Sequence, residues 1–389
     1  MSTRINLTAY NKQQLSDFCS ELGLPRYRAD QLFQWIHLKN AGSFGEMTNL
    51  PKALRGELEK KAELKGVDRA SVSRSKDGTV KCLFRLHDEK LVEAVLIPEF
   101  FDDGVADRLT VCVSSQVGCV FGCSFCATGK MGLFRNLSTG EITGQVLAMN
   151  ALAEAEYGKR ITNIVYMGMG EPFHNYTPVV DSAEILCDPL GLDLSPRRIT
   201  ISTVGLTRQI RSYADEQRPW NLAISLHAAD DEKRNKIMPI NETLDLKALR
   251  GALEHYHRTM RQPVTYEYLL FDNFNDSPED ARKLAGIARW IPSKINIIMY
   301  NSVEGVTLQR AREDRLDRFM AELTRQGARA TVRRSRGDDI DAGCGQLAIR
   351  EQDGEGKTIA GKSSGKQKSG RQNPGKRSGG EKTVPDTWN

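Results

Sequence analysis

The chain has 389 residues, which is enough for two or three domains and one large hydrophobic core. Hydrophobic residues make up 39% and charged residues 27% of it, and no apolar run reaches roughly 18 residues. The first residues also lack the apolar segment of a signal peptide. This composition is that of a soluble globular protein, and we expect it in the cytoplasm with no membrane partner.

The first 70 residues predict a small helical domain. The segments LGLPRYRADQLFQWI and LPKALRGELEKKA place apolar residues at helical spacing, and Pro51 stands near the start of the second. Arg26, Arg28, Lys52 and Arg55 can grip a phosphate backbone, or they can be ordinary solvated charges. The sequence leaves both interpretations open.

Residues 71–108 change to alternating, β-branched segments. TVKCLFRL, KLVEAVLIPE and RLTVCVSSQ follow one another, with turn residues such as Asp77-Gly78 and Asp88-Glu89 between them. We expect a short β meander that links the helical domain to the rest.

Residues 109–350 alternate between strand and helix patterns. Segments such as ITNIVYMGMGEP, RRITISTVG, NLAISLHA, PVTYEYLLF, KINIIMYN and ARATVRR are separated by amphipathic helices. Ser138 and Glu141 form a capping box and predict a helix directly after the cysteine-rich loop described below, and Ser277 with Pro278 starts another. The pattern predicts an α/β fold with a parallel sheet, closed or partly closed as a barrel, whose chemistry lies at the carboxyl ends of the strands.

Residues 351–389 differ from everything before them. They are rich in Gly, Ser and Lys, and eight Lys or Arg against five Asp or Glu contribute more than half of the net charge of +5. Such a segment cannot bury enough apolar surface to fold alone, so we expect a disordered basic tail. Any RNA-binding surface on the folded part must then be a local patch.

Three closely spaced cysteines, Cys119, Cys123 and Cys126, form a C-x3-C-x2-C triplet with Phe125 before the last. A structural zinc site needs four ligands, whereas three thiolates can hold a 4Fe–4S cluster with one iron left open. A zinc loop and three unrelated buried thiols are the alternatives. The triplet resembles the signature of the radical S-adenosylmethionine (SAM) superfamily.

That resemblance implies one 4Fe–4S cluster on the triplet and SAM bound at the strand ends. The GMGEP segment resembles the superfamily's GEP motif, which receives the methionine ammonium. The other polar residues would bind the carboxylate, ribose and adenine of SAM, although each taken alone is about as well explained as a turn residue. The expected SAM contacts are Gly170, Glu171, Ser202, Ser225, His227 and Asn301.

Two further cysteines, Cys112 and Cys344, come from opposite ends of the barrel sequence. Cys112 ends the first strand of the barrel, and Cys344 follows the last one. The first and last strands of a barrel approach each other, so both thiols can face one active site. A pair of unrelated buried cysteines is the alternative.

Together, GCVFGCSFCATG, RNLSTGEI, MGMGEP, ISTVG, SLHA and RGDDIDAGCGQLA resemble the RlmN family of radical SAM RNA methyltransferases. PRYRADQLFQWI and MTNLPKALR resemble its N-terminal accessory domain. The resemblance covers the chain to about residue 350. It implies a radical SAM partial (β/α) barrel that methylates C2 of adenosine at position 2503 of 23S rRNA and of adenosine 37 of tRNA. These bases must be extruded or already unstacked to reach the barrel interior.

The resemblance also implies a mechanism with two SAM molecules per turnover. One methylates Cys344, and the second yields a 5'-deoxyadenosyl radical that activates this methyl group for addition to the adenine. Cys112 then resolves the protein–RNA adduct by forming a disulfide with Cys344. Glu99 resembles the family's acidic residue near the target base, although an exposed strand-end glutamate is the alternative. Beside the loop that carries Cys344, the candidates to hold RNA phosphates are Arg333, Arg334 and Arg336.

Two other functions compete with C2 methylation. The related resistance methylase modifies C8 of the same rRNA adenosine, but its motif usually carries Ala where this chain has Pro172. A non-catalytic RNA-binding protein with a structural metal is the other possibility. For the enzyme we expect an electron donor such as flavodoxin, and a monomer.

Overall fold

The structure is a computed structural model that describes residues 4–101, 104–348, 351–352 and 358–359. Residues Met1–Ile349 form one compact unit, and Arg350–Asn389 form another. In the second unit, β15 (Glu351–Gln352) pairs with β16 (Thr358–Ile359) in antiparallel fashion. The predicted disorder of the rest of the tail lies outside the described residues.

A ten-stranded sheet organises the first unit, in the order β14-β13-β12-β11-β10-β9-β6-β5-β4-β3. The seven strands from β14 to β6 run parallel, and β3 to β6 form an antiparallel meander at one side. The edge strands β14 and β3 are not paired with each other, so the barrel is partial. The strands are β3 (Asp68–Arg74), β4 (Val80–Arg85), β5 (Leu91–Phe100), β6 (Ala106–Cys112), β9 (Asn163–Tyr166), β10 (Ile199–Thr203), β11 (Asn221–Ser225), β12 (Val264–Leu270), β13 (Ser293–Met299) and β14 (Ala330–Arg333).

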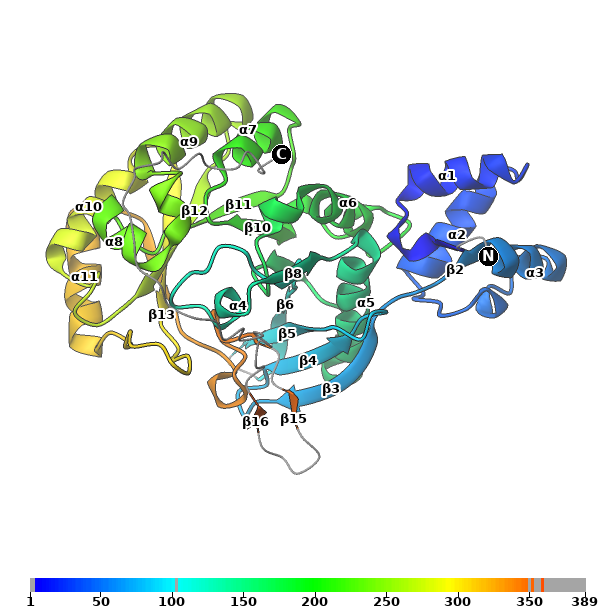
Figure 1. Cartoon of the computed structure of the whole chain (residues 1–389), viewed down its shortest axis with the longest axis horizontal. Helices are drawn as coiled ribbons and strands as arrows, with labels where there is room; N and C mark the ends of the chain where they lie inside the picture. The colour runs from blue at the N-terminus through cyan, green and yellow to red at the C-terminus, as the bar shows by residue number, and fades with distance from the viewer. Residues whose placement is uncertain (1–3, 102–103, 349–350, 353–357, 360–389) are drawn as a thin grey trace, which may run out of the picture. The chain divides into compact units, whose positions relative to one another are not determined.

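The strands β9 to β13 are mostly buried, as expected for strands covered on one side by helices and on the other by the barrel interior. Figure 1 shows helices along the outer side of the curved sheet. The helices of this part are α5 (Thr139–Tyr157), α6 (Tyr176–Cys187), α7 (Thr207–Asp215), α8 (Asp231–Ile237), α9 (Leu246–Met260), α10 (Pro278–Ala288) and α11 (Glu313–Arg325).

The predicted capping boxes are confirmed, but one predicted connection is wrong. Ser138 caps α5 with Glu141, and Ser277 caps α10 with Asp280. The helix α5 does not follow the cysteine loop directly. A short helix, α4 (Ala127–Lys130), and a strand, β8 (Leu133–Asn136), intervene, and β8 pairs with β7 (Gln116–Gly118). The cysteine loop is therefore closed at its base by a hairpin.

The N-terminal segment forms the predicted helices, which pack around a second hydrophobic core that Ile185 of α6 completes. That core contains Leu7, Leu32, Phe33, Leu58 and other buried residues. A short parallel pair, β1 (Ile5–Asn6) and β2 (Ala62–Glu63), joins its two ends. Its helices are α1 (Lys12–Glu21), α2 (Tyr27–His37) and α3 (Lys52–Lys61). No helix within the described ranges is both long and apolar enough to span a bilayer.

Candidate active site

The three thiols of the triplet line one cavity at the carboxyl ends of the parallel strands. We call this the triplet cavity, and Cys119, Cys123 and Cys126 all face it. Burial raises the pKa of Cys119 to about 12 and that of Cys123 well above its ordinary value. Burial also raises the pKa of Cys126, although hydrogen bonds from the backbone of Gly129 act against it. Raised pKa values keep these buried thiols protonated at neutral pH, and they become thiolates when a metal binds them.

The arrangement of the triplet thiols is compatible with an iron–sulfur cluster. In the part of the chain that the structure describes, no three His, Cys, Asp or Glu side chains converge as ligands of one metal ion. The triplet thiols instead border a shared space. In an iron–sulfur cluster each cysteine binds a different iron, so three separated thiols around a cavity fit that group.

A buried arginine that the sequence analysis missed supports the same fit. Arg234 on α8 is 1% exposed and donates hydrogen bonds to the carbonyl oxygens of Leu226, at 3.1 Å, and Val204, at 2.7 Å. It has no carboxylate within ion-pair distance among the described residues, and Cys123 is the leading group that raises its pKa against burial. A buried cation needs a compensating negative charge, and cluster-bound thiolates would supply it.

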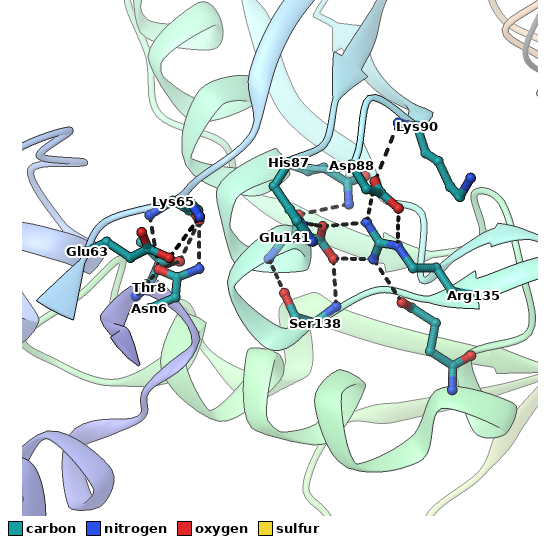
Figure 2. Close-up of polar contacts among 12 residues, drawn as sticks. Asn6, Thr8, Glu63, Lys65, His87, Asp88, Lys90, Arg135, Ser138 and Glu141 are labelled. Carbon is teal, nitrogen blue, oxygen red and sulfur yellow. Dashed lines mark hydrogen bonds and ion pairs between the residues drawn. The ribbon is translucent and has the colours of Figure 1, made fainter. Parts of the chain in front are cut away.

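The hairpin at the base of the cysteine loop is held by a polar network (Figure 2). Arg135 on β8 lies between Asp88 and Glu141 and donates to both carboxylates at 2.8–2.9 Å. These hydrogen bonds hold the pKa of Asp88 well below its usual range. Burial alone would raise the pKa of Glu141, but Arg135 and the backbone N–H of Ser138 lower it. The network ties the loop to the meander and to α5.

Glu171 of the GMGEP segment lines the triplet cavity and is almost fully buried. Its carboxylate accepts backbone hydrogen bonds from Phe173, at 3.0 Å, and Val204, at 2.9 Å. Burial raises its pKa to about 7, despite these hydrogen bonds. Gly170, with φ of +96°, has no room for a side chain, because a Cβ would lie 2.5 Å from the Cβ of Gln116. The segment therefore forms a tight, close-packed wall of the cavity.

Three more predicted residues meet at the same cavity. The hydroxyl oxygens of Ser202 and Ser225 lie 3.2 Å apart, and both residues line the cavity with His227. The His227 Nδ1 atom accepts a hydrogen bond from the backbone N–H of Leu269 at 3.2 Å, and burial lowers its pKa to about 3. His227 is thus neutral with its proton on Nε2. Phe125, the aromatic residue of the triplet motif, packs edge-on against its ring at 4.9 Å.

Cys344 lies on a loop that is docked onto the cysteine loop. The carbonyl oxygen of Gly345 accepts from the backbone N–H of Ala127 at 2.8 Å, and the hydroxyl of Thr128 donates to the Leu347 carbonyl at 2.6 Å. Gly343 could not carry a side chain, because its Cβ would lie 1.9 Å from Asn301 Nδ2. These contacts bring Cys344 to the wall of the triplet cavity.

A neighbouring cavity, the thiol cavity, is lined by both Cys112 and Cys344. Burial raises the pKa of Cys112 to about 12, and Cys344 adds to this rise. Arg333 lies beside the two thiols. The nearby Cys344 raises the pKa of the Arg333 guanidinium, while burial acts to lower it. Both cysteines are free thiols here, so their disulfide stays a prediction. Asn301 lines this cavity and not the triplet cavity, so its contact to SAM also stays a prediction.

Glu99 lies in a third cavity, the inner cavity, further along the barrel axis. Because β5 is antiparallel to β6 and Glu99 pairs with Arg108, it lies toward the opposite end of the barrel from Cys112. Its carboxylate is 3.7 Å from the Arg108 guanidinium. The inner cavity also contains the buried carboxylate of Glu267, whose Oε2 has no hydrogen-bond partner among the described residues. Of the predicted site residues, Glu99 lies there together with the proposed phosphate contacts Arg333, Arg334 and Arg336.

The meander supports the Cys344 loop through residues that the sequence analysis did not single out. Glu93 on β5 pairs with Lys81 on β4 at 3.1 Å and accepts from the backbone N–H of Ala348 at 3.0 Å. Lys81 also donates to the Asp341 carbonyl at 3.2 Å. Asp77, in the turn before β4, accepts from the backbone N–H of Gly337 at 2.9 Å. The antiparallel strands therefore fix the loop that carries Cys344.

Comparisons with known proteins agree with this architecture. Residues 113–285 match the radical SAM superfamily, and residues 5–64 match the ribosomal RNA large subunit methyltransferase N-terminal domain. The solved structure of a radical SAM methyltransferase from Sphaerobacter thermophilus superposes with a TM-score of 0.82 at 41% identity, covering 88% of this chain and 99% of that one. The protein is a radical SAM enzyme with the partial barrel fold of that superfamily, and it uses SAM and an iron–sulfur cluster.

The particular family follows from full-length relatives. A probable dual-specificity RNA methyltransferase RlmN from Salinibacter ruber is 50% identical, over 90% of this chain and 95% of the relative. The dual-specificity RNA methyltransferase RlmN of Syntrophotalea carbinolica is 42% identical, over 89% of this chain and 90% of the relative. The chain belongs to the RlmN family of RNA methyltransferases, as the sequence motifs indicated.

Proposed function

We propose that the protein methylates C2 of adenosine at position 2503 of 23S rRNA and of adenosine 37 of tRNA. The observation that carries this proposal is the position of Cys344. It lines both the triplet cavity and the thiol cavity, where Cys112 is found. A thiol so placed has access to the cofactor on one side and to a resolving thiol on the other. The names of the relatives, dual-specificity RNA methyltransferase, and the match of residues 5–64 to the N-terminal domain of a methyltransferase of large-subunit ribosomal RNA support RNA as the substrate.

The residues of the triplet cavity would hold the cofactors. Cys119, Cys123 and Cys126 would bind one 4Fe–4S cluster, balanced by Arg234. Of the two SAM molecules used per turnover, one would supply the methyl group. The other would be cleaved by one electron that the cluster supplies. The polar residues that would contact SAM are Gly170, Glu171, Ser202, Ser225, His227 and Asn301.

The two cysteines of the thiol cavity carry the group transfer on the protein side. The sulfur of Cys344 accepts the methyl group and presents its carbon to C2 of the adenine. After this carbon has bonded to C2 and C2 has lost its proton, the Cys112 thiolate bonds to the sulfur of Cys344. The electron pair of the broken sulfur–carbon bond goes to the carbon, which takes up a proton, and the methylated base leaves. An external reductant returns the resulting disulfide to two thiols. Glu99, Arg333, Arg334 and Arg336 line cavities next to this thiol pair and are the proposed contacts to the RNA.

Several further assignments complete the proposal. Residues 1–70 act as an accessory RNA-binding domain, 71–108 as a β linker and 109–350 as the catalytic barrel, with 351–389 as a basic tail. The division is supported by the second hydrophobic core, to which residues 1–70 contribute all the buried members except Ile185. The enzyme works as a cytoplasmic monomer and receives electrons from a donor such as flavodoxin.

The test is nucleoside mass spectrometry, with chromatography against authentic standards, on 23S rRNA and tRNA from cells with and without the protein. We expect 2-methyladenosine that depends on the gene in both RNAs. The appearance of 8-methyladenosine would retain the cysteine chemistry but contradict the C2 assignment. Unchanged methyladenosine in both RNAs would contradict the proposed function.

A further inference from the structure

The barrel has a second opening, at the amino-terminal ends of its parallel strands. This opening, the amino-terminal mouth, lies where β10, β11, β12, β13 and β14 begin, at the opposite end of the strands from the triplet cavity. No Asp or Glu lines it among the described residues. Five basic side chains do, namely Arg108, Arg197, Arg198, Lys294 and Arg329.

Most of these cations are free. Arg197, Arg198, Lys294 and Arg329 are exposed. Within the described part of the chain, none of these four has a carboxylate within the 4.0 Å of an ion pair, and only Arg108 does, with Glu99. Unpaired cations that converge on one opening repel one another and produce a positive field, which attracts a polyanion.

Cavities with shared lining residues lie between the mouth and the thiols of Cys112 and Cys344. The inner cavity, with a volume of about 540 Å³, shares Arg108 and Lys294 with the mouth. It shares Arg333 and Arg334 with the thiol cavity, which contains Cys112 and Cys344. The thiol cavity in turn shares Cys344 with the triplet cavity. Neighbouring cavities therefore share lining residues between the two ends of the barrel. The thiol cavity, with a volume of about 30 Å³, is smaller than a base, so side chains that line it must move aside for the adenine.

The opposite end is less suited to a polymer. There the Cys344 loop is fastened to the cysteine loop by the hydrogen bonds from Ala127 and Thr128. A nucleic-acid backbone cannot follow a base into a barrel, because its phosphates remain hydrated and charged, so only the extruded base enters. The flanking phosphates need cations outside the opening through which the base passes.

We propose that the amino-terminal mouth is the RNA entrance of this enzyme. Phosphates of the nucleotides that flank the target adenosine bind Arg197, Arg198, Lys294 and Arg329, while the adenine passes through the inner cavity to Cys344. RNA and SAM thus reach the thiol from opposite ends of the barrel. This inference rests on the proposed function, and it adds the route and the contacts of the substrate.

The test compares two triple variants of the full-length holoenzyme that remove the same charge. The mouth variant is R197A/R198A/R329A, and the matched control is R208A/R211A/K247A, which removes three exposed cations from α7 and α9. The probe is a fluorescent tRNA anticodon stem-loop with adenosine at position 37, titrated over a series of salt concentrations. Loss of three phosphate contacts should raise Kd by about 10- to 100-fold and reduce the salt slope by about 2 to 3.

Two readouts separate this inference from the proposed function. Methylation of Cys344 by SAM needs no RNA, so the mouth variant should retain it at the wild-type rate. The variant R197K/R198K/R329K keeps the charges and should recover most of the affinity. Equal weakening in the control, or an unchanged Kd in the mouth variant while wild type methylates RNA, overturns the entrance. A wild-type protein that does not methylate RNA overturns the proposed function itself.

Discussion

Charged side chains are buried and hydrogen-bonded at one end of the barrel, and exposed at the other. At the carboxyl end, Arg234 and Glu171 are buried and engaged with the backbone, and His227 is held neutral. At the amino end, Arg197 and Arg329 are exposed and have no carboxylate partner among the described residues. An end that positions a small cofactor needs fixed donors and acceptors. An end that meets a large polyanion needs charges that are free to pair with it.

The largest expected effect comes from removing the thiol that lies between the two ends. In Cys344→Ala the methyl carrier is absent, so we expect the rate of RNA methylation to fall by at least about 1,000-fold. The measurement is transfer of labelled methyl groups to RNA. Cys187→Ala is the matched control, because Cys187 is also a half-buried free thiol but lies outside the cavities described. Methylation by Cys344→Ala at the wild-type rate would exclude the proposed mechanism.

Removing one ligand of the triplet should abolish the cofactor rather than the fold. Purified anaerobically, Cys119→Ala should lack the iron, sulfide and visible absorption of the cluster, with methylation at background. Cys112→Ala is the comparison. It should retain the iron but accumulate a covalent protein–RNA adduct, visible as a shifted band on a denaturing gel. Stoichiometric zinc without iron in the wild type would contradict the cluster assignment.

A smaller effect, on the free energy of unfolding, should distinguish an arginine in an ion pair from an arginine without one. Arg135→Ala leaves the buried Glu141 carboxylate without its main partner, and we expect a loss of about 2 to 3 kcal/mol in the free energy of unfolding, measured in urea. Arg197→Ala at the mouth breaks no ion pair and should change the free energy of unfolding by less than about 0.5 kcal/mol. Equal losses in the two variants would mean that the mouth arginines are structural, which would remove the contrast between the two ends.

The smallest effect concerns a buried histidine outside the barrel. Burial lowers the pKa of His37 from 6.5 to about 4. The unfolded chain therefore binds a proton that the folded chain does not, so stability is full above pH 6.5 and is lost as the pH falls toward 4. At about pH 5 we expect a loss of roughly 2 kcal/mol.

The His37 prediction is checked by urea unfolding at neutral and acidic pH. His37→Gln keeps a donor for the Tyr10 carbonyl and should show a weaker pH dependence. His255→Gln, which removes a histidine that contacts Asp215, is the control. If His37→Gln has the same pH dependence as the wild type, another group is responsible for it.

Much of the fold could be predicted because its signals are local. Strand periodicity, Ser138 with Glu141, and the cysteine spacing depend only on residues close together in the chain. The role of Arg234 could not be predicted, because a charged residue in a short helix looks solvated until the tertiary fold buries it. The same is true of Glu93 and Lys81, which hold the Cys344 loop from strands more than 240 residues away in sequence. The free charge of the mouth likewise depends on which side chains have no partner in space.

The shared position of Cys344 has a mechanical consequence. Its loop is fastened on both sides, by Ala127 and Thr128 at the cysteine loop and by Glu93 at the meander. Yet the residue borders both the triplet cavity and the thiol cavity. Cysteine has one side-chain torsion that moves its sulfur, the rotation about the Cα–Cβ bond between staggered positions. Under the proposed function, this torsion would carry the carbon from donor to acceptor while the backbone stays still.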